Sequence, residues 1–579
     1  DAAGPLGFDW LEAQLTRVWK LRGPCPGLPS ALAAFGVPQA VPFTTIDRGC
    51  FPDPVVAAEH PMPKPSAMDD ALDPRRVRAL VVDELEKAKA AGHTLLPQAE
   101  IVTRIRGREL SVTCPVTGDV LDAHHLSAGT VAAGGPLAGV TLPDGSPALQ
   151  LAELAEIGGL IRSHVERRLR AAPIGGAPDF AGALDAHLGA IRSDLPGDER
   201  AAELRAREEK VAALKTLYSS RISVLIGSAG TGKTTLLKVL HDTPSVKAGG
   251  VLLVAPTGKA RVQLAHRVQA HAVTLAQFLV ATKRYDPWTE RYVVTGDAQT
   301  RAKNYKTVVV DEASMLTEEQ LGALLDAVTG VERLVLVGDP RQLPPIGAGR
   351  PFVDIVRRLA PDDIATRFPR CGRGYAELTI PRRQAGQERD DLVLASWFAD
   401  GELSPAADLV WQRLRTGERM ENLRAVRYER SRLFTTLLEV LREEIPELQD
   451  VPDEYLANAF GRSYGGSVSA KGNLYFPKGA GGKVDAWQIL SPVRGRAWGT
   501  TEINRTLKDM FGQRALEQAI GPDRYHAKPI GPERIVVVDR GSRAPHQARR
   551  TRAQQERGDH RRSAARPERH VRLRGAVHR

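Results

Sequence analysis

The sequence predicts an α/β fold in which a parallel sheet is flanked by helices on both faces. From about residue 198 to residue 370 the pattern strand, loop, helix repeats along the chain, which is typical of a parallel sheet. Four of these strands run into polar or glycine-rich loops, and ligands of such sheets bind at the carboxyl ends of the strands. Because the chain has 579 residues, we expect further domains beside this sheet.

The first strand, residues 221–226, precedes a glycine-rich loop and an amphipathic helix that opens at residues 235–240. The loop reads Gly-Ser-Ala-Gly-Thr-Gly-Lys-Thr-Thr, which matches the phosphate-binding pattern G-x-x-x-x-G-K-[ST]. In such loops the main-chain N–H groups bind phosphates, the lysine reaches the β- and γ-phosphates, and the hydroxyl binds Mg²⁺. A chance glycine-rich turn is the alternative. The residues expected to hold ATP are Gly227, Ser228, Ala229, Gly230, Thr231, Gly232, Lys233, Thr234 and Thr235.

Acidic and amide side chains follow two further predicted strands, residues 308–310 and 334–337. Asp311 is the carboxylate expected to complete the Mg²⁺ site with Thr234, and Glu312 is expected to activate the attacking water. The alternative is a helix N-cap followed by a first-turn acid. Gln342 is expected to contact the γ-phosphate and the water, or else to stabilise its own loop by hydrogen bonds.

The region before residue 198 predicts small accessory domains of mixed α and β structure. Helical spacing predicts helices over residues 10–20, 73–91 and 151–171, alternation over 100–113 suggests strands, and residues 172–180 are typical of a linker. A charged helix over residues 198–217 then leads into the glycine-rich loop. These patterns do not predict a chemistry for residues 1–197.

Composition restricts the function only weakly. The formal net charge is +11, but residues 540–579 hold thirteen arginines, no lysine and three acidic residues, so the rest of the chain is nearly neutral. Overall basicity is therefore no evidence for nucleic-acid binding by the body of the protein. The four cysteines are scattered, which favours a reducing cytoplasm and argues against a zinc cluster. No run of eighteen apolar residues is present, so no membrane span is expected.

Taken together, the loops resemble motifs of a known enzyme family. The loop at 227–235, A-P-T-G-K-A from residue 255, V-V-D-E-A-S-M-L and V-G-D-P-R-Q-L-P-P resemble motifs I, Ia, II and III of superfamily 1 helicases. They are most similar to the RecD-like group, which includes the exonuclease V alpha subunit. The segment L-T-I-P-R-R-Q, residues 378–384, resembles motif IV, and this implies Arg383, or less directly Arg382, as an arginine finger. Residues 487–507 resemble the strand and helix that follow.

The resemblance implies an ATP-dependent DNA helicase or translocase that moves 5′-to-3′ on single-stranded DNA in repair or recombination. Its implied partners are single-stranded DNA, single/double-strand junctions, and nuclease or repair subunits. Pro256, Thr257 and Lys259, with Thr274 in motif Ib, are implied DNA contacts. The implied domains are an accessory region (1–197), a first RecA-like domain (198–370) with a hairpin insertion (281–304), a partial second RecA-like domain (371–538) and a disordered arginine-rich tail (539–579).

Residues 283–294 interleave basic residues with Tyr285, Trp288 and Tyr292, where RecD-like helicases carry a small hairpin that splits the duplex. These aromatic residues either stack on or wedge into DNA, or pack the hairpin itself.

The chain departs from the family pattern in two places. The glutamine that usually contacts adenine is missing from residues 207–211, which leaves the preference for adenine open. Motifs V and VI are absent, and the resemblance stops after residue 538. We therefore expect a frameshift or truncation near that point. The alternative function is then a protein that binds ATP and DNA with impaired hydrolysis and unwinding, and a third is a fusion whose nuclease lies elsewhere.

Overall fold

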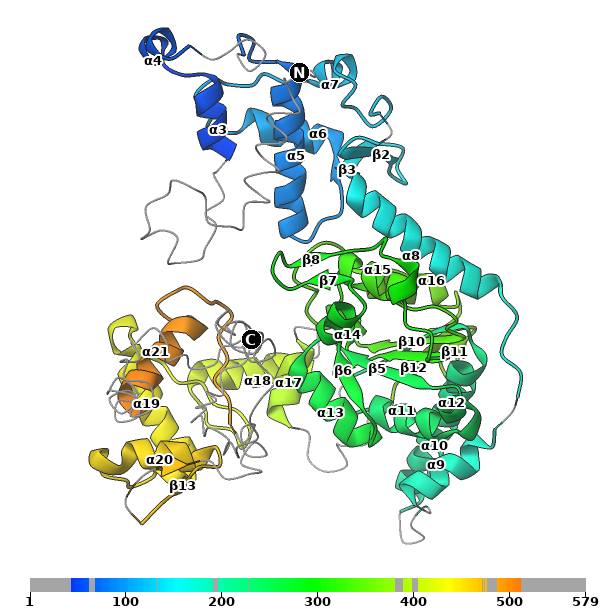
Figure 1. Ribbon diagram of the computed structural model, residues 1–579. Helices are drawn as coiled ribbons and strands as arrows, with labels where there is room; N and C mark the ends of the chain where they lie inside the picture. Colours follow the sequence, from blue (N-terminus) through cyan, green and yellow to red (C-terminus); the bar gives the residue numbers. More distant parts are fainter. Residues whose placement is uncertain are drawn as a thin grey trace, which may run out of the picture. The chain divides into compact units, whose positions relative to one another are not determined.

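The computed structural model divides into two compact units, residues 1–403 and 404–579 (Figure 1). It describes residues 43–61, 68–132, 134–176, 178–189, 191, 196–228, 230–380, 389–397, 405–470, 472, 474–475 and 487–511. The expected helix at 10–20, Ala229, Arg382, Arg383 and everything after residue 511 lie outside these ranges.

A seven-stranded sheet forms the centre of the first unit, and its strands are parallel except for one edge strand, β11, which runs antiparallel to β12. This confirms the predicted α/β class with a parallel sheet. In spatial order the strands are β11 (Cys371–Gly372), β12 (Tyr375–Leu378), β4 (Ile222–Gly227), β10 (Arg333–Gly338), β9 (Thr307–Val310), β5 (Val251–Ala255) and β6 (Ala272–Thr274).

Helices cover both faces of this sheet because successive strand residues point to opposite sides (Figure 1). On β10, Leu334 and Leu336 pack into the core beneath α14, α15 and α16, whereas Val335 and Val337 pack beneath α10, α11 and α13. These helices are α10 (Gly197–Ser219), α11 (Lys233–Asp242), α12 (Pro244–Ala248), α13 (Gly258–Val268), α14 (Leu275–Ala281), α15 (Glu318–Ala327) and α16 (Pro351–Leu359). Helix α17 (Asp390–Ser396) follows the sheet along the chain.

The boundary expected between residues 370 and 371 falls inside this sheet. Strand β12 pairs in parallel with β4, and Leu378 lies opposite Gly227 in the register. Residues 371–378 therefore complete the first sheet rather than begin the next domain. The sequence pattern missed this because β11 and β12 are only two and four residues long.

The region before residue 198 contains an antiparallel sheet of three strands, ordered β1-β3-β2, with helices around it. Helix α8 packs against α15, and its apolar residues share one continuous core with the seven-stranded sheet. The elements are α3 (Phe43–Cys50), α4 (Pro54–Glu59), α5 (Pro74–Ala90), β1 (Leu96–Pro97), α6 (Gln98–Arg106), α7 (Gly118–Ala123), β2 (Leu137–Thr141), β3 (Pro147–Leu151), α8 (Ala152–Arg170) and α9 (Phe180–Leu188).

The strands expected over residues 100–113 are wrong, because this segment begins inside helix α6. Ile101 and Ile105 lie four residues apart on α6 and are both buried, so they form one apolar helix face. The helices expected at 73–91, 151–171 and 198–217 are confirmed as α5, α8 and α10. No helix in the described part of the chain is long and apolar enough to cross a membrane.

The second unit is mainly helical where the structure describes it. Its apolar residues cluster between α19, α20 and α21, and Trp487 packs against Phe460 with ring centroids 5.4 Å apart. The described residues 487–499 form no strand, with a single bridge residue at Ile489, whereas the helix expected after them is confirmed as α21. The elements are α18 (Pro405–Thr416), α19 (Leu433–Glu444), α20 (Leu456–Ser463), β13 (Ser467–Val468), β14 (Leu474–Tyr475) and α21 (Thr500–Phe511).

Strands β13 and β14 form an antiparallel pair, the single sheet found among the described residues of this unit. A second RecA-like sheet in this half of the chain therefore stays an expectation.

Candidate active site

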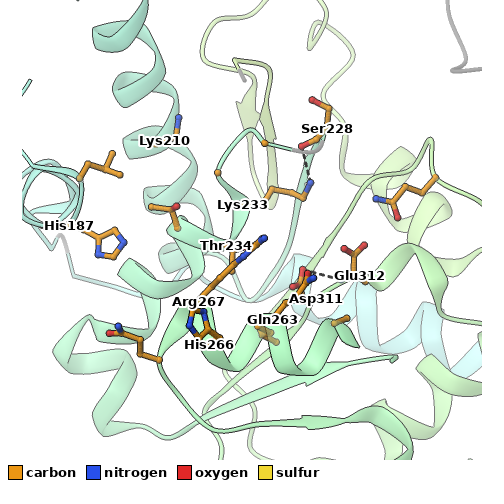
Figure 2. Close-up of a pocket in the computed structure, with 18 residues that line it drawn as sticks. His187, Lys210, Ser228, Lys233, Thr234, Gln263, His266, Arg267, Asp311 and Glu312 are labelled. Atoms are coloured by element: carbon orange, nitrogen blue, oxygen red, sulfur yellow. Dashed lines mark hydrogen bonds between the residues drawn. The ribbon is translucent and has the colours of Figure 1, made fainter. Parts of the chain in front are cut away.

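A cavity of about 820 Å³ lies at the carboxyl ends of β4, β9 and β10. It is lined by the glycine-rich loop together with Asp311, Glu312 and Gln342, which come from the ends of the two other strands (Figure 2). Because these strands are parallel neighbours in the centre of the sheet, their ends meet at one edge. The fold thus brings together side chains that lie more than one hundred residues apart.

The loop between β4 and α11 has a conformation that depends on glycine. Gly227 has φ of 155°, and a Cβ there would lie 2.7 Å from the carbonyl oxygen of Leu378. Gly232 has φ of 96° and forms the N-cap of α11. Between them Thr231 is fully buried, and its hydroxyl donates to the Ser228 carbonyl at 2.9 Å. The loop is therefore held open at the N-terminus of a helix, where main-chain N–H groups bind anions.

The Lys233 side chain points back at the glycine-rich loop. Its Nζ donates to the Gly227 carbonyl at 2.5 Å and to the Ser228 carbonyl at 3.2 Å (Figure 2). Burial lowers the pKa of Lys233, and the nearby Glu312, Asp339 and Asp311 oppose this effect. The ammonium group of Lys233 thus lies against the glycine-rich loop, with carboxylates close by.

Asp311 and Glu312 follow β9 directly and face the same cavity. Burial, and then the charge of Glu312, raise the pKa of Asp311 to about 6, so a cation beside it would stabilise its charged form. The Thr234 side chain lines the same cavity. Mg²⁺ is typically held by one or two carboxylates, water and substrate phosphates, so Thr234 and Asp311 fit such an ion.

The backbone of Glu312 is unusual. Its φ is 53°, a left-handed conformation that non-glycine residues seldom adopt and that often occurs at functional sites. Its N–H donates to Asp311 Oδ1 at 3.1 Å, which restrains the Asp311 carboxylate relative to the strand end.

Gln342 lies in the loop after β10, where its N–H donates to the Asp339 carbonyl at 3.1 Å. Asp339 in turn accepts from the Arg341 N–H at 3.1 Å. This turn leaves the Gln342 side chain exposed in the cavity, opposite the glycine-rich loop. The structure thus gathers Lys233, Thr234, Asp311, Glu312 and Gln342, while their chemical roles stay predictions.

The residues expected to contact DNA lie at the ends of the two outermost strands on one side of the sheet. Ala255 of β5 lies opposite Thr274 of β6, so the following loops are neighbours. Thr257 and Thr274 are the N-caps of α13 and α14, accepting from the N–H groups of Ala260 and Gln277, each at 3.2 Å. Pro256 and Lys259 are half-buried beside them. These loops occupy the same edge of the sheet as the cavity.

The expected hairpin forms from β7 (Tyr285–Asp286) and β8 (Arg291–Tyr292), which pair antiparallel. Tyr285 and Tyr292 pack on each other with ring centroids 4.8 Å apart, and the Tyr292 hydroxyl accepts from Gln320 at 3.0 Å. Trp288, at the turn, is 64% exposed. The two tyrosines therefore pack the hairpin itself, and Trp288 is the aromatic residue left at its surface.

The sequence patterns missed a second wall of the cavity. Helix α13 contributes polar residues whose spacing of three and four, from 263 to 266 and 267, is the signal that would have identified one helix face. Helices α9 and α10 contribute residues with no such signal, because their position depends on how they pack. The missed lining residues are His187, Leu188, Lys210, Ala260, Gln263, Leu264, His266, Arg267 and Gln269.

Residues 205–396 match a family model described as "AAA domain". RecBCD enzyme subunit RecD of Mycolicibacterium smegmatis is 34% identical over 195 residues, which cover 30% of this chain and 33% of that protein. The ATP-dependent RecD2 DNA helicase of Deinococcus radiodurans is 32% identical over 291 residues, covering 49% of this chain and 37% of that protein. The chain is therefore similar to RecD-like proteins over about a third to a half of its length, and residues 205–396 are similar to an AAA domain.

The chain spans about a third of the length of these two relatives. The segment that matches the AAA-domain model begins within α10 and contains the phosphate loop, the Asp311–Glu312 pair and Gln342, whereas α9 precedes it. Among solved structures, the Pif1 helicase from Candida albicans aligns with 20% identity and a TM-score of 0.27, covering 40% of this chain and 53% of that one.

Proposed function

We propose that this chain is an ATP-dependent DNA helicase or translocase of the RecD-like group that uses Mg²⁺ and moves 5′-to-3′ on single-stranded DNA. The observation that carries the proposal is the single cavity in which the phosphate loop meets Asp311, Glu312 and Gln342. Similarity to RecD over 195 residues and to RecD2 over 291 residues supports it. DNA repair or recombination is the proposed process, with single-stranded DNA or strand junctions as ligands and nuclease or repair subunits as partners.

Each of these residues of the cavity has its own role in the transfer of the γ-phosphoryl group to water. Loop N–H groups and Lys233 bind the phosphates, and the γ-phosphate then lies towards the acidic pair. Thr234 and Asp311 would hold Mg²⁺, which supplies charge neutralisation on the phosphate oxygens. Glu312 orients and deprotonates the attacking water, and Gln342 bridges the γ-phosphate and that water. Arg383, outside the described residues, is the proposed arginine finger.

DNA would pass over the neighbouring loops at the ends of β5 and β6. The N-termini of α13 and α14, capped by Thr257 and Thr274, point towards this edge and favour the phosphates of a strand. Pro256 and Lys259 complete this surface. Because backbone groups of DNA are identical at every nucleotide, such contacts permit movement without reading the base sequence.

The experiment that tests the proposal is strand separation measured with fluorescent duplexes carrying either a 5′ or a 3′ single-stranded tail. We expect ATP-dependent separation of the 5′-tailed duplex and little separation of the 3′-tailed one. Glu312→Gln is the matched variant, because it retains the shape of the side chain and loses the base. It should bind ATP and DNA yet separate neither duplex. ATP-independent separation, or equal separation by Glu312→Gln, would contradict the proposed mechanism.

A further inference from the structure

We propose that His187 and Leu188 of α9, with Lys210 of α10, form the base-binding side of the nucleotide site and accept a purine by stacking. This inference rests on the proposed function, since it assumes that a nucleoside triphosphate fills the cavity. All three residues line that cavity. Helix α9 precedes the matched AAA domain, so His187 and Leu188 come from a part of the chain that the domain match does not include, whereas Lys210 lies within it.

The direction of the nucleotide follows from the order of side chains across the cavity. Figure 2 shows His187 on one side of Lys233 and Thr234, and Asp311 and Glu312 on the other. The γ-phosphate belongs beside the two carboxylates and their ion. A nucleoside triphosphate is an extended molecule, so its base must leave the phosphate loop on the opposite side, towards α9.

Helix α9 is fixed where it lies. Phe180 and Leu184 are almost fully buried in the core beneath α10, and the Phe180 ring meets the Tyr218 ring edge-on, with centroids 5.6 Å apart. At the other end of α9, Arg207 pairs with Asp185 and donates to the Gly189 carbonyl at 2.9 Å. The last turn of α9 is thereby bound to α10, and it presents His187 and Leu188 to the cavity.

The chemistry of these side chains predicts which bases fit. His187 is exposed and Leu188 is half-buried, so an imidazole ring and apolar surface are both available at this wall of the cavity. An imidazole face and an aliphatic side chain stack on any base, and a purine offers the larger face. This wall therefore favours purines over pyrimidines.

Lys210 is the residue of the segment 207–211 that lines the cavity, where the usual adenine-contacting glutamine is missing. Its Nζ donates to the Ala206 carbonyl at 3.2 Å, and its Cε lies 3.1 Å from the place of a Cβ on Gly232. Its neighbour Glu209 is occupied elsewhere, accepting from the Thr379 N–H at 2.7 Å. A lysine donates hydrogen bonds and accepts none, so it cannot recognise the exocyclic amine of adenine. Stacking does not distinguish adenine from guanine, so we expect ATP and GTP to bind with similar affinity.

Competition against a fluorescent ATP analogue in the presence of Mg²⁺ tests the subsite. The competitors are ATP, GTP, CTP, UTP and inorganic tripolyphosphate, which carries the phosphates without a base. For the wild-type chain we expect the dissociation constants of ATP and GTP to agree within about threefold. CTP and UTP should bind about tenfold more weakly, because a pyrimidine offers less stacking area. His187→Ala should weaken ATP and GTP about tenfold, leave tripolyphosphate unchanged and remove the preference for purines.

Two further variants make the result decisive. His187→Phe should restore the affinity for ATP, because it keeps an aromatic face, and His271→Ala, an exposed histidine outside the cavity, should change nothing. Unchanged ATP affinity in His187→Ala, or an equal loss of ATP and tripolyphosphate, would overturn the base subsite. Full affinity of Lys233→Ala for tripolyphosphate would instead overturn the phosphate site of the proposed function. It would do so even if His187→Ala weakened the binding of ATP and left that of tripolyphosphate unchanged.

Discussion

At the scale of single residues, Glu318 is a carboxyl group whose pKa differs clearly from that of an ordinary surface acid. It begins α15, just after the acidic pair, and its N–H donates to the Ala348 carbonyl at 3.0 Å. Its side chain lies against Gly349, where an added Cβ would come within 2.5 Å of Glu318 Cγ. Burial, and then the charges of Asp354 and Glu319, raise the pKa of Glu318 to about 7.

This shift predicts a pH dependence of stability. Because the pKa of Glu318 rises from the ordinary value of 4.5 to about 7, the folded state binds more protons than the unfolded state between these pH values. The stability that Glu318 contributes is therefore present below pH 4.5 and is lost as the pH rises to about 7. Glu318→Gln should remove this loss, so that its free energy of unfolding, relative to wild type, rises by about 1–3 kcal/mol across the window.

Urea unfolding of both proteins at a series of pH values measures this difference. The exposed Glu156→Gln is the control and should follow the wild type throughout. A constant difference between Glu318→Gln and wild type from pH 4.5 to 7 would show that the Glu318 carboxyl titrates normally.

At the scale of elements, helix α10 is bound to the segment that leaves strand β12. The Glu209 carboxylate is fully buried and accepts hydrogen bonds from Thr379 N–H at 2.7 Å and Thr379 Oγ at 2.6 Å. A weaker bond from the Ile380 N–H measures 3.4 Å. One carboxylate therefore holds the helix that leads into the phosphate loop against the end of a neighbouring strand.

Glu209→Gln should destabilise the fold, because an amide can offer only one oxygen to these donors and buries an NH₂ group beside them. Leaving a buried donor unpaired costs about 1–3 kcal/mol. We expect a loss of that size in the free energy of unfolding, measured by urea denaturation. The neighbouring Glu208 is exposed, so Glu208→Gln should unfold at the wild-type midpoint. Equal stability of the two variants would mean that this contact contributes nothing.

The helices and strands also show which parts of the fold could be predicted from sequence patterns. The strands β4, β5, β9 and β10 could be predicted because each is a mainly apolar run that ends in a polar or glycine-rich motif, and the cavity lies where such motifs meet. Alternation misled at α6, where a short amphipathic helix has apolar residues four apart. The His187 side of the cavity could not be predicted, because it depends on the packing of Phe180 and Leu184 far from any motif.

At the scale of the whole molecule, the proposed DNA binding has two different candidate sources, the arginine-rich residues 540–579 and the loops of the sheet. Residues 540–579 carry thirteen of the chain's arginines, whereas the loops at the ends of β5 and β6 belong to the folded sheet. Neutralising phosphates releases counterions, so either source gives salt-dependent binding. Removing one of them separates their contributions.

We expect a chain that lacks residues 540–579 to retain weakly sequence-dependent binding of single-stranded DNA. Fluorescence anisotropy with a labelled oligonucleotide measures it at several salt concentrations, and the slope against salt should become shallower without disappearing. Lys259→Ala in the shortened chain should weaken binding further. Complete loss of binding on removal of the tail would place DNA affinity in the tail rather than in the sheet loops.

The chain can work as a motor only if DNA bound to the loops after β5 and β6 changes the rate of ATP hydrolysis in the cavity. The cavity at β4, β9 and β10 and the loops at β5 and β6 share one edge of one sheet, so the two ligands would lie side by side. Hydrolysis of ATP in the presence and absence of single-stranded DNA is the direct measure of that coupling.

The decisive measurement is the steady-state rate of phosphate release from Mg·ATP by the purified chain, with and without single-stranded DNA. We predict a DNA-stimulated rate for the wild type, loss of nucleotide binding in Lys233→Ala, and binding without turnover in Glu312→Gln. ATP binding without DNA-stimulated turnover in the wild type would favour the alternative of a binding protein with impaired hydrolysis. A Lys233→Ala variant that binds and hydrolyses ATP like the wild type would contradict the assignment of the phosphate loop itself.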